Sequence, residues 1–348
     1  MEVDAAPGIG VRNSQPEGIG RVVALEGAVC WNNLGRNVVF ADASLHPIAV
    51  WGTTLYPGED EPSQYDLDVH AVLDATDLGL VLVLNHFGTV RGFRRADVLS
   101  RGAVRTVEPV SVWSFVADVE RAVFAGGRLV GSGPRAGGAI GALVSAPLAA
   151  VAEDGPIPVH ACGAAFGEVT ALAVVPSADG ELVAIGGDGT VALAPLDGDR
   201  LAPPRWEADV GFRVASLEWD GAALWAAGPD RAPALDDYDW DRLHGGGFSA
   251  LGLDGAHVAS GPLPDDVAWG TGGTAVARSG ASVLAAGRTG RLHVVDPRHP
   301  ARERCTPPLA GASLGIAHLA VAGPRAVFGF NRGGYRLHAY GSPGPGTA

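Results

Sequence analysis

The chain has 348 residues, of which 47% are apolar, with 51 Gly and 25 Pro and a formal net charge of −13. This composition excludes a disordered chain, because enough apolar surface is available for a core, and the many glycines and prolines exclude long helices. All 25 basic residues are arginine, which excludes chemistry that needs a lysine, such as a Schiff base or a P-loop phosphate site. The acidic balance argues against a nucleic-acid partner.

The start of the chain has no cationic region followed by an apolar stretch, so no secretory signal is expected. The longest apolar run, 139–152, is broken by Pro147 and is too short to span a membrane. We therefore expect a soluble, cytoplasmic protein. The cysteines Cys30, Cys162 and Cys305 are widely separated and form no CxxC pair, so we expect free, mostly buried thiols.

A repeated pattern of short strands runs along the chain. Each unit has an apolar strand, a Gly/Asp turn, a second apolar strand, a Gly-rich turn and a third strand, which is typical of β-hairpins. The units occupy residues 22–51, 69–93, 120–148, 169–196, 214–253, 274–296 and 316–341. They recur at roughly the 40 to 50 residues that one blade of a β-propeller needs. We therefore expect a single all-β domain, a seven-bladed β-propeller.

The unit at 169–196 contains Val169-Thr170-Ala171-Leu172-Ala173, Pro176, Asp179-Gly180, Ala184, Gly186-Gly187 and Asp188-Gly189-Thr190-Val191. In these residues it resembles a bacterial-type WD40 repeat. The Trp-Asp that closes the third strand of such repeats is Ala194-Pro195 here, and the Gly-His before the first strand is missing, so the repeats are degenerate. The resemblance implies a WD40-like or quinoprotein-like propeller and no enzyme activity.

The expected propeller spans residues 19–341. Residues 1–18 are expected to be a flexible N-terminal segment or the strand that closes the ring, and the Gly/Pro-rich tail 342–348 is expected to be disordered. In a propeller the first strand of each blade lines the central channel. The turns between second and third strands share one face with the loops that enter the next blade, and ligands and partners usually bind that face.

The most unusual segment is a long insertion, 228–247, between the second and third strands of the fifth unit. Alternating Asp237, Asp239 and Asp241 suit a calcium ion, but Arg242 and Phe248 stand where a calcium loop has Gly and Glu. The alternatives are a solvated acidic loop, or a recognition loop of aromatic and acidic residues. The candidate ligand or partner site is Asp236, Asp237, Tyr238, Asp239, Trp240, Asp241 and His244, with His86 expected on the same face.

Two histidines are candidates for a site inside the channel. His70 and His318 are both expected on channel-lining strands, where they are possible ligands of a divalent metal. The alternative is a structural role, with each imidazole bonded to a backbone carbonyl.

Arginines are concentrated in one stretch of the second unit. Arg91, Arg94 and Arg95, followed by Arg101 and Arg105, form either a stripe that binds an acidic partner or a solvated blade edge whose charges deter strand addition.

The remaining motif does not have the context that catalysis needs. Residues 311–315 match the GxSxG pattern, but they precede an expected strand, whereas the motif works on a strand-to-helix turn. We therefore expect a non-enzymatic scaffold, with no cofactor, that presents loops to a protein or peptide partner, and neither nucleic acid nor a membrane is an expected partner. The alternative is a small-molecule enzyme, or a metal- or cofactor-binding propeller, with its site at the channel mouth.

Overall fold

The computed structural model describes the strands of the ring and part of the loops between them. The described residues are 19–25, 28–33, 37–42, 46–52, 69–85, 88–115, 119, 121–132, 143–147, 155–157, 160–161, 168–198, 200–230, 245–267, 276–279, 282–287, 289–300, 304–305, 316–322, 325–330 and 338–341.

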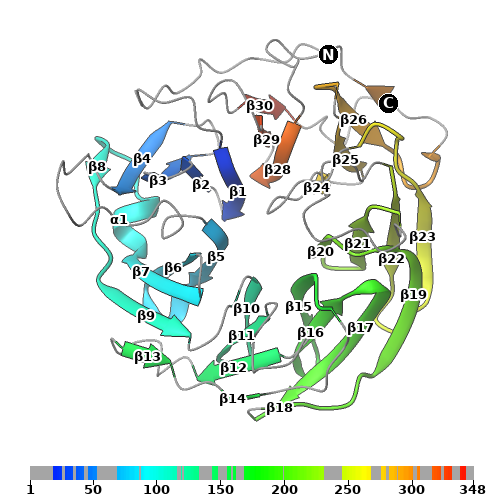
Figure 1. Cartoon of the computed structure of the whole chain (residues 1–348), viewed down its shortest axis with the longest axis horizontal. Coiled ribbons are helices and arrows are strands. Elements are labelled where there is room, and N and C mark those ends of the chain that lie inside the picture. Colours follow the sequence, from blue (N-terminus) through cyan, green and yellow to red (C-terminus); the bar gives the residue numbers. More distant parts are fainter. Residues whose placement is uncertain are drawn as a thin grey trace.

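The strands of the described residues form seven separate sheets arranged around a central axis (Figure 1). Sheet 1 consists of β1 (Ile19–Leu25), β2 (Ala28–Asn33), β3 (Asn37–Asp42), β4 (Pro47–Gly52) and β8 (Arg105–Thr106). Sheet 2 consists of β5 (Val69–Ala75), β6 (Leu80–Asn85), β7 (Thr89–Arg94), β9 (Ser111–Phe115) and β13 (Gly155–Ile157). Sheet 3 consists of β10 (Arg121–Ala125), β11 (Arg128–Ser132), β12 (Leu143–Pro147) and β14 (His160–Ala161).

The other four sheets follow in chain order. Sheet 4 consists of β15 (Ala171–Ser177), β16 (Gly180–Gly186), β17 (Asp188–Asp197), β18 (Arg200–Leu201) and β19 (Trp206–Arg213). Sheet 5 consists of β20 (Ser216–Trp219), β21 (Leu224–Gly228), β22 (Gly247–Leu251) and β23 (His257–Pro262). Sheet 6 consists of β24 (Val276–Ser279), β25 (Ser282–Ala286), β26 (Leu292–Val295) and β27 (Arg304–Cys305), and sheet 7 of β28 (Ile316–Ala322), β29 (Arg325–Phe330) and β30 (His338–Gly341).

The first strands of the seven sheets lie innermost and contact one another in a closed circle, in the order β1, β5, β10, β15, β20, β24, β28 and back to β1. The predicted all-β propeller and single domain are confirmed. Six sheets have the four or more strands of a complete blade, whereas sheet 7 has three among the described residues. The structure thus has six complete blades where the sequence predicted seven, because a fourth strand of the last sheet does not occur in the described part of the chain.

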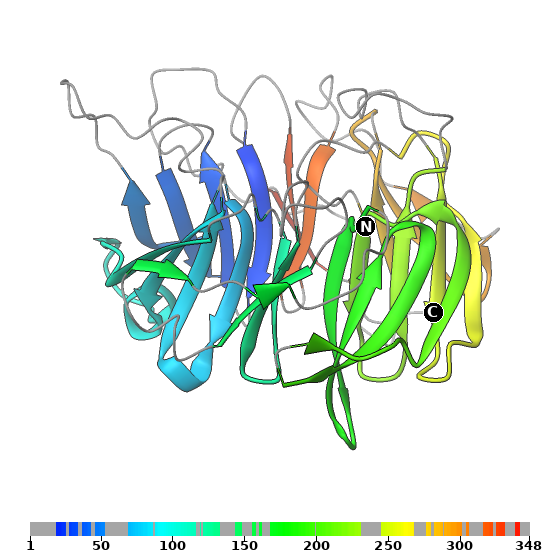
Figure 2. The same cartoon turned by 60° about the horizontal axis from the view of Figure 1, so that its bottom comes forward.

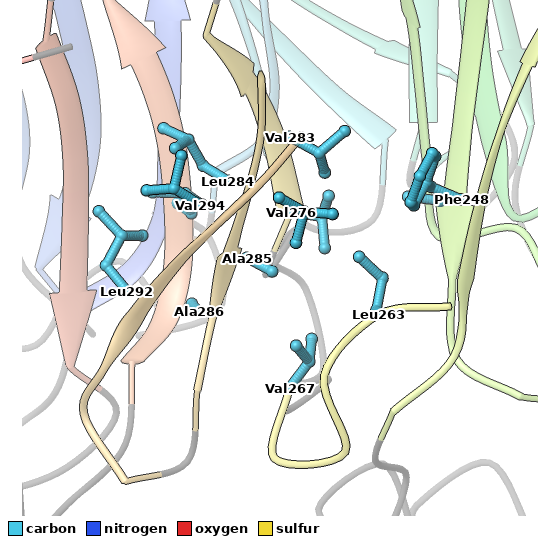
Figure 3. Close-up of a cluster of buried hydrophobic side chains, with 13 residues drawn as sticks. Phe248, Leu263, Val267, Val276, Val283, Leu284, Ala285, Ala286, Leu292 and Val294 are labelled. Atoms are coloured by element: carbon cyan, nitrogen blue, oxygen red, sulfur yellow. The ribbon is translucent and has the colours of Figure 1, made fainter. Parts of the chain in front are cut away.

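The core consists of apolar layers between neighbouring sheets, so sheets 1 to 6 are each buried on both faces. In β16, Val183 and Ile185 pack in the cluster shared with sheet 3, and Leu182 and Ala184 pack in the cluster shared with sheet 5. Since alternate side chains of a strand point to opposite faces, a strand buried on both sides is apolar at most successive positions. Figure 3 shows the layer between sheets 5 and 6, where Phe248 of β22 faces Val276 and Val283.

The strands run between two faces of the disc (Figure 2). One face has the turns between the second and third strands of each sheet and the loops that enter the next sheet. We call it the upper face. These two kinds of segment bond to each other there: the backbone N–H of Val214 donates to the carbonyl of Gly187 at 3.0 Å. The lower face has the turns between first and second strands and the connections between third and fourth strands.

The outer edges of sheets 1 and 2 are covered by strands from the following sheet. β8 pairs in parallel with β4, and β13 pairs in parallel with β9. Each comes from the connection between the third and fourth strands of the next sheet, and we call such a connection a clasp. The first clasp includes the short helix α1 (Arg95–Leu99), whose Val98 is fully buried between sheets 1 and 2. The other helical turn in the described residues is η2 (Thr76–Leu78).

Clasps join two further pairs of sheets. The indole N–H of Trp206, on the outer strand β19 of sheet 4, donates to the carbonyl of Leu253 in the clasp of sheet 5 at 2.8 Å. A Cβ at Gly261, on the outer strand β23 of sheet 5, would lie 3.1 Å from Pro300 in the clasp of sheet 6. The connection between third and fourth strands therefore reaches back to the preceding blade in four places, which the repeat pattern did not predict.

No helix in the described residues has the length and apolar character needed to cross a membrane.

We expect Val98→Ala to lower the free energy of unfolding by about 2 kcal/mol, because it empties space in the layer that the first clasp closes. Val104→Ala, in the same clasp but 56% exposed, is the matched control and should change stability by less than about 0.5 kcal/mol. Urea unfolding measures both variants. Equal losses in the two variants would contradict a role of the clasp in stability.

Candidate interaction surfaces

The two ends of the long insertion are held together on the upper face. A Cβ at Gly246 would lie 2.0 Å from the carbonyl oxygen of Gly228, and Gly246 has a φ of 120°, so this close approach requires glycine. From sheet 4, the backbone N–H of Arg213 donates to the carbonyl of Pro229 at 2.9 Å. The insertion therefore leaves the disc from a stem that is fixed to the neighbouring blade.

The loop that leads from sheet 5 to sheet 6 borders this stem. The backbone N–H of Gly245 donates to the carbonyl of Val267 at 3.2 Å. In the same loop, the Asp266 carboxylate accepts a hydrogen bond from the Thr289 hydroxyl at 2.8 Å and lies 2.7 Å from His293 Nε2. The Thr289 hydroxyl thus bonds to the carboxylate and not to the imidazole, whereas a catalytic triad has its imidazole next to the hydroxyl. We therefore assign Asp266, Thr289 and His293 a structural role.

The residues that the sequence analysis ranked first lie outside the described part of the chain. They are Asp236, Asp237, Tyr238, Asp239, Trp240, Asp241, His244 and His86. Cys162 and the GxSxG segment 311–315 also lie outside it.

The two channel histidines come from strands that flank the same neighbour. β1 contacts both β5, which contains His70, and β28, which contains His318. His70 is half-buried, and the side chain of His318 lies outside the description. No three His, Cys, Asp or Glu side chains of the described residues are grouped to hold a metal ion. A metal site at these two histidines stays a prediction.

The arginine stretch is largely paired within the molecule. Arg91 donates to Asn85 Oδ1 at 2.9 Å, and its guanidinium lies 4.8 Å above the Trp51 ring. Arg95 forms an ion pair with Asp74 at 3.0 Å. Arg94 is exposed at the end of β7 and is therefore the best placed of the three predicted stripe residues to contact a partner.

The described cysteines differ in exposure. Cys30 is buried in sheet 1, and this burial raises the pKa of its thiol, so the thiol stays protonated and unreactive. Cys305 is a free thiol on β27 and is exposed. The expectation of buried thiols is correct for Cys30 and wrong for Cys305.

A further cluster, which the sequence analysis did not find, lies at the lower ends of sheets 5 and 6. The Arg278 guanidinium lies 4.0 Å above the Trp225 ring and donates to Asp220 Oδ2 at 2.5 Å. The same carboxylate oxygen accepts from the Trp225 indole N–H at 2.8 Å, and Glu218 accepts from the backbone N–H of Arg278 at 3.4 Å. The adjoining cavity, of about 20 Å³, has room for a water molecule and none for an organic ligand.

Burial and hydrogen bonding act differently on the two carboxyl groups of this cluster. Burial raises the pKa of Glu218 and outweighs the opposing effect of Arg278. Burial also acts to raise the pKa of Asp220, but the backbone N–H groups of Ala223 and Ala222, the Trp225 indole and Arg278 together hold it below its usual value. Asp220 is therefore a fixed anion that locks Arg278 between the two blades.

Comparison with known proteins reveals similarity in structure. No family model matches the chain, and no curated protein matches its sequence. The solved WD40 domain of Pan2 from Neurospora crassa is similar, with a TM-score of 0.60 and 12% identity over 94% of this chain and 90% of that one. The WD40 β-propeller domain of Doa1 has a TM-score of 0.58 and 10% identity, over 99% and 98% of the two chains.

The chain has the fold of a WD40-like β-propeller. The computationally designed protein Ika8 is also similar, with a TM-score of 0.51 and 13% identity over 94% of this chain and 97% of that one. At such low identities the similarity shows the fold alone.

We expect Asp220→Asn to lower the free energy of unfolding at pH 7 by about 1 kcal/mol, the usual net contribution of a hydrogen bond. The pKa of Asp220 is lower in the folded state than in the unfolded state. The extra stability of the wild type is therefore complete at a pH above the unfolded-state pKa, and it is lost as the pH falls through the folded-state pKa. Urea unfolding of both proteins at pH 7 and at acid pH measures the advantage. Asp77→Asn, at an exposed turn on the lower face of sheet 2, is the control. A stability difference between wild type and Asp220→Asn that grows at acid pH would contradict the role of Asp220.

Proposed function

We propose that the protein is a non-enzymatic scaffold that binds a protein or peptide partner through segments displayed on a rigid propeller. The observation that carries this proposal is the fixed stem of the insertion: Gly228 and Gly246 hold its ends together, and the neighbouring blade bonds to it. A loop whose ends are held in this way loses less conformational entropy on binding than a free one. The WD40 fold of the similar structures agrees with such a role.

We propose the insertion as the binding element, with Asp236, Asp237, Tyr238, Asp239, Trp240, Asp241 and His244 on it and His86 beside it. Aromatic and acidic side chains together provide contact area and charge selectivity, which is how a few residues dominate an interface. A cytoplasmic location stays part of the proposal on the sequence argument alone.

We further propose that sheet 7 is the seventh blade and that residues 1–18 provide its missing outer strand. Two observations support this. β28 occupies a place in the inner circle equivalent to that of the other first strands, since it contacts β24 on one side and β1 on the other. β30 is the outer strand of sheet 7 among the described residues, so its free edge can take another strand.

Native mass spectrometry of the protein purified gently from its own organism tests the proposed function. A chain that co-purifies with a second protein at fixed stoichiometry supports the scaffold. A stoichiometric metal ion or organic molecule on the isolated chain would instead favour the alternative, a small-molecule or cofactor site at the channel mouth near His70 and His318.

We expect Asp237→Ala combined with Trp240→Ala to abolish binding of that partner while the melting temperature stays nearly unchanged, because substitutions on a displayed loop cost little stability. Co-purification and thermal unfolding measure the two effects. A large fall in melting temperature would show that the insertion has a structural role instead.

A further inference from the structure

Sheet 4 has the longest outer strand in the described part of the disc. This strand, β19, has eight residues, whereas the corresponding strands β4, β9 and β23 of sheets 1, 2 and 5 have six, five and six. β19 lies at the outer side of the disc (Figure 1). The backbone N–H and C=O groups along the outer side of such a strand are a template for pairing with a further strand.

The corresponding edges of sheets 1 and 2 are each covered by an added strand. β8 pairs in parallel with β4 over two residues, and β13 pairs in parallel with β9 over three. The clasp that could cover β19 in this way is that of sheet 5, 252–256. It turns back on itself instead, because the backbone N–H of Gly252 donates to the carbonyl of Ala256 at 2.9 Å. The edge of β19 therefore receives no strand from the described residues.

Only the lower half of this edge is regular. Residues 206–209 form four successive pairs with β17, without a bulge or a proline. Beyond Asp209 the register shifts at a bulge, where Gly211 has a φ of 78° and its N–H donates to Asp209 Oδ1 at 2.9 Å. A bulge twists an edge and deters pairing. We call the outer side of residues 206–209 the open edge of sheet 4.

One face of the open edge is apolar. Ala208 belongs to the cluster shared with sheet 5, and Trp206 and Val210 pack against the same cluster. These three residues alternate along β19, so they share the face of sheet 4 that lies toward sheet 5. Ala208 is the smallest of them, and an apolar side chain of an added strand that lies opposite Ala208 therefore contacts its two larger neighbours as well.

The other face of the open edge is acidic. Glu207 pairs with Ala192, which shares a face of β17 with Ala194, and Ala194 packs in the cluster shared with sheet 3. Glu207 and Asp209 thus lie on the face toward sheet 3, and both are exposed. Neither forms an ion pair with another described residue. Because side chains directly opposite each other on paired strands are close, a basic residue of an added strand would be stabilised here.

We infer that the open edge of sheet 4 binds an extended segment of a partner protein as an added β-strand, in which apolar residues alternate with arginines or lysines. In this mode of binding the backbone bonds provide affinity and the alternating side chains provide selectivity. The apolar residues lie beside Ala208, and the basic residues lie beside Glu207 and Asp209. The inference rests on the proposed scaffold function and gives the scaffold a second surface, separate from the insertion.

A second copy of the chain is a poorer occupant of the open edge. In a two-fold antiparallel pairing of β19 with its copy centred on Ala208, Glu207 of each copy would lie opposite Asp209 of the other. In one centred on Glu207, the two Glu207 side chains would lie opposite each other. Like charges directly opposite each other destabilise paired strands.

A fluorescein-labelled nine-residue peptide of alternating arginine and valine is the probe, and fluorescence anisotropy with the full chain measures its binding. We expect a Kd of about 20 µM at low salt, which is typical of a weak peptide complex. Glu207→Arg should weaken binding about tenfold, because it places like charges opposite each other, and Glu207→Gln about threefold. Glu207 is exposed, so both variants keep the fold.

Matched controls separate strand addition from general attraction to an acidic protein. Glu108→Arg makes the same change at an exposed position of sheet 2 and should leave the Kd within twofold. The same peptide, methylated on the backbone nitrogens of two successive central residues, keeps its charge but loses a donor on each edge, and should bind about tenfold more weakly.

Hydrogen-exchange mass spectrometry of the complex should show slower exchange at residues 206–209. Equal effects of Glu207→Arg and Glu108→Arg, equal binding of the methylated peptide, or slower exchange only elsewhere would overturn the inference. A dimer of the chain that the peptide dissociates would identify a second copy as the occupant and would also overturn it. If partner capture still depends on Asp237 and Trp240, the scaffold stands and the open edge of sheet 4 alone is excluded.

Discussion

Burial on both faces of a sheet, found in sheets 1 to 6, is the constraint on which the rest of this structure depends. A strand such as β16, apolar at four successive positions, cannot be stable in a sheet that exposes one face to water. Each sheet therefore needs a neighbour on each side, and the requirement ends only when the last sheet meets the first. The contact of β28 with β1 closes the ring and satisfies this requirement. As a result, the loops on both faces gain a rigid base.

The sequence predicted the architecture well because the relevant signals are local. Each hairpin is encoded by apolar strands and a Gly/Asp turn within about 30 residues, so the unit at 169–196 predicts β15, β16 and the upper part of β17. The clasps could not be predicted in this way. β8 has two residues and β13 has three, and what makes them strands is pairing with the outer edge of the preceding blade and not a pattern of their own.

The same difference between local and distant contacts explains the outcome for the candidate sites. The insertion stood out because it interrupts a regular repeat. The cluster around Arg278 gives no such signal, because Arg278 and Asp220 are 58 residues apart and meet only when sheets 5 and 6 pack together. Likewise, the arginine stretch looked like a binding stripe in the sequence, but Asn85, Trp51 and Asp74 engage Arg91 and Arg95 in the folded protein.

The clasps have a consequence for how such a ring changes in length during evolution. Each one links the third strand of a blade to its fourth by way of the preceding blade, as α1 and β8 do between β7 and β9. A gene duplication that copied one sheet alone would insert a blade whose outer edge faces a clasp built for a different neighbour. The segment that can be gained or lost without damage is thus one sheet together with the clasp of the next, a unit offset from the visible repeat.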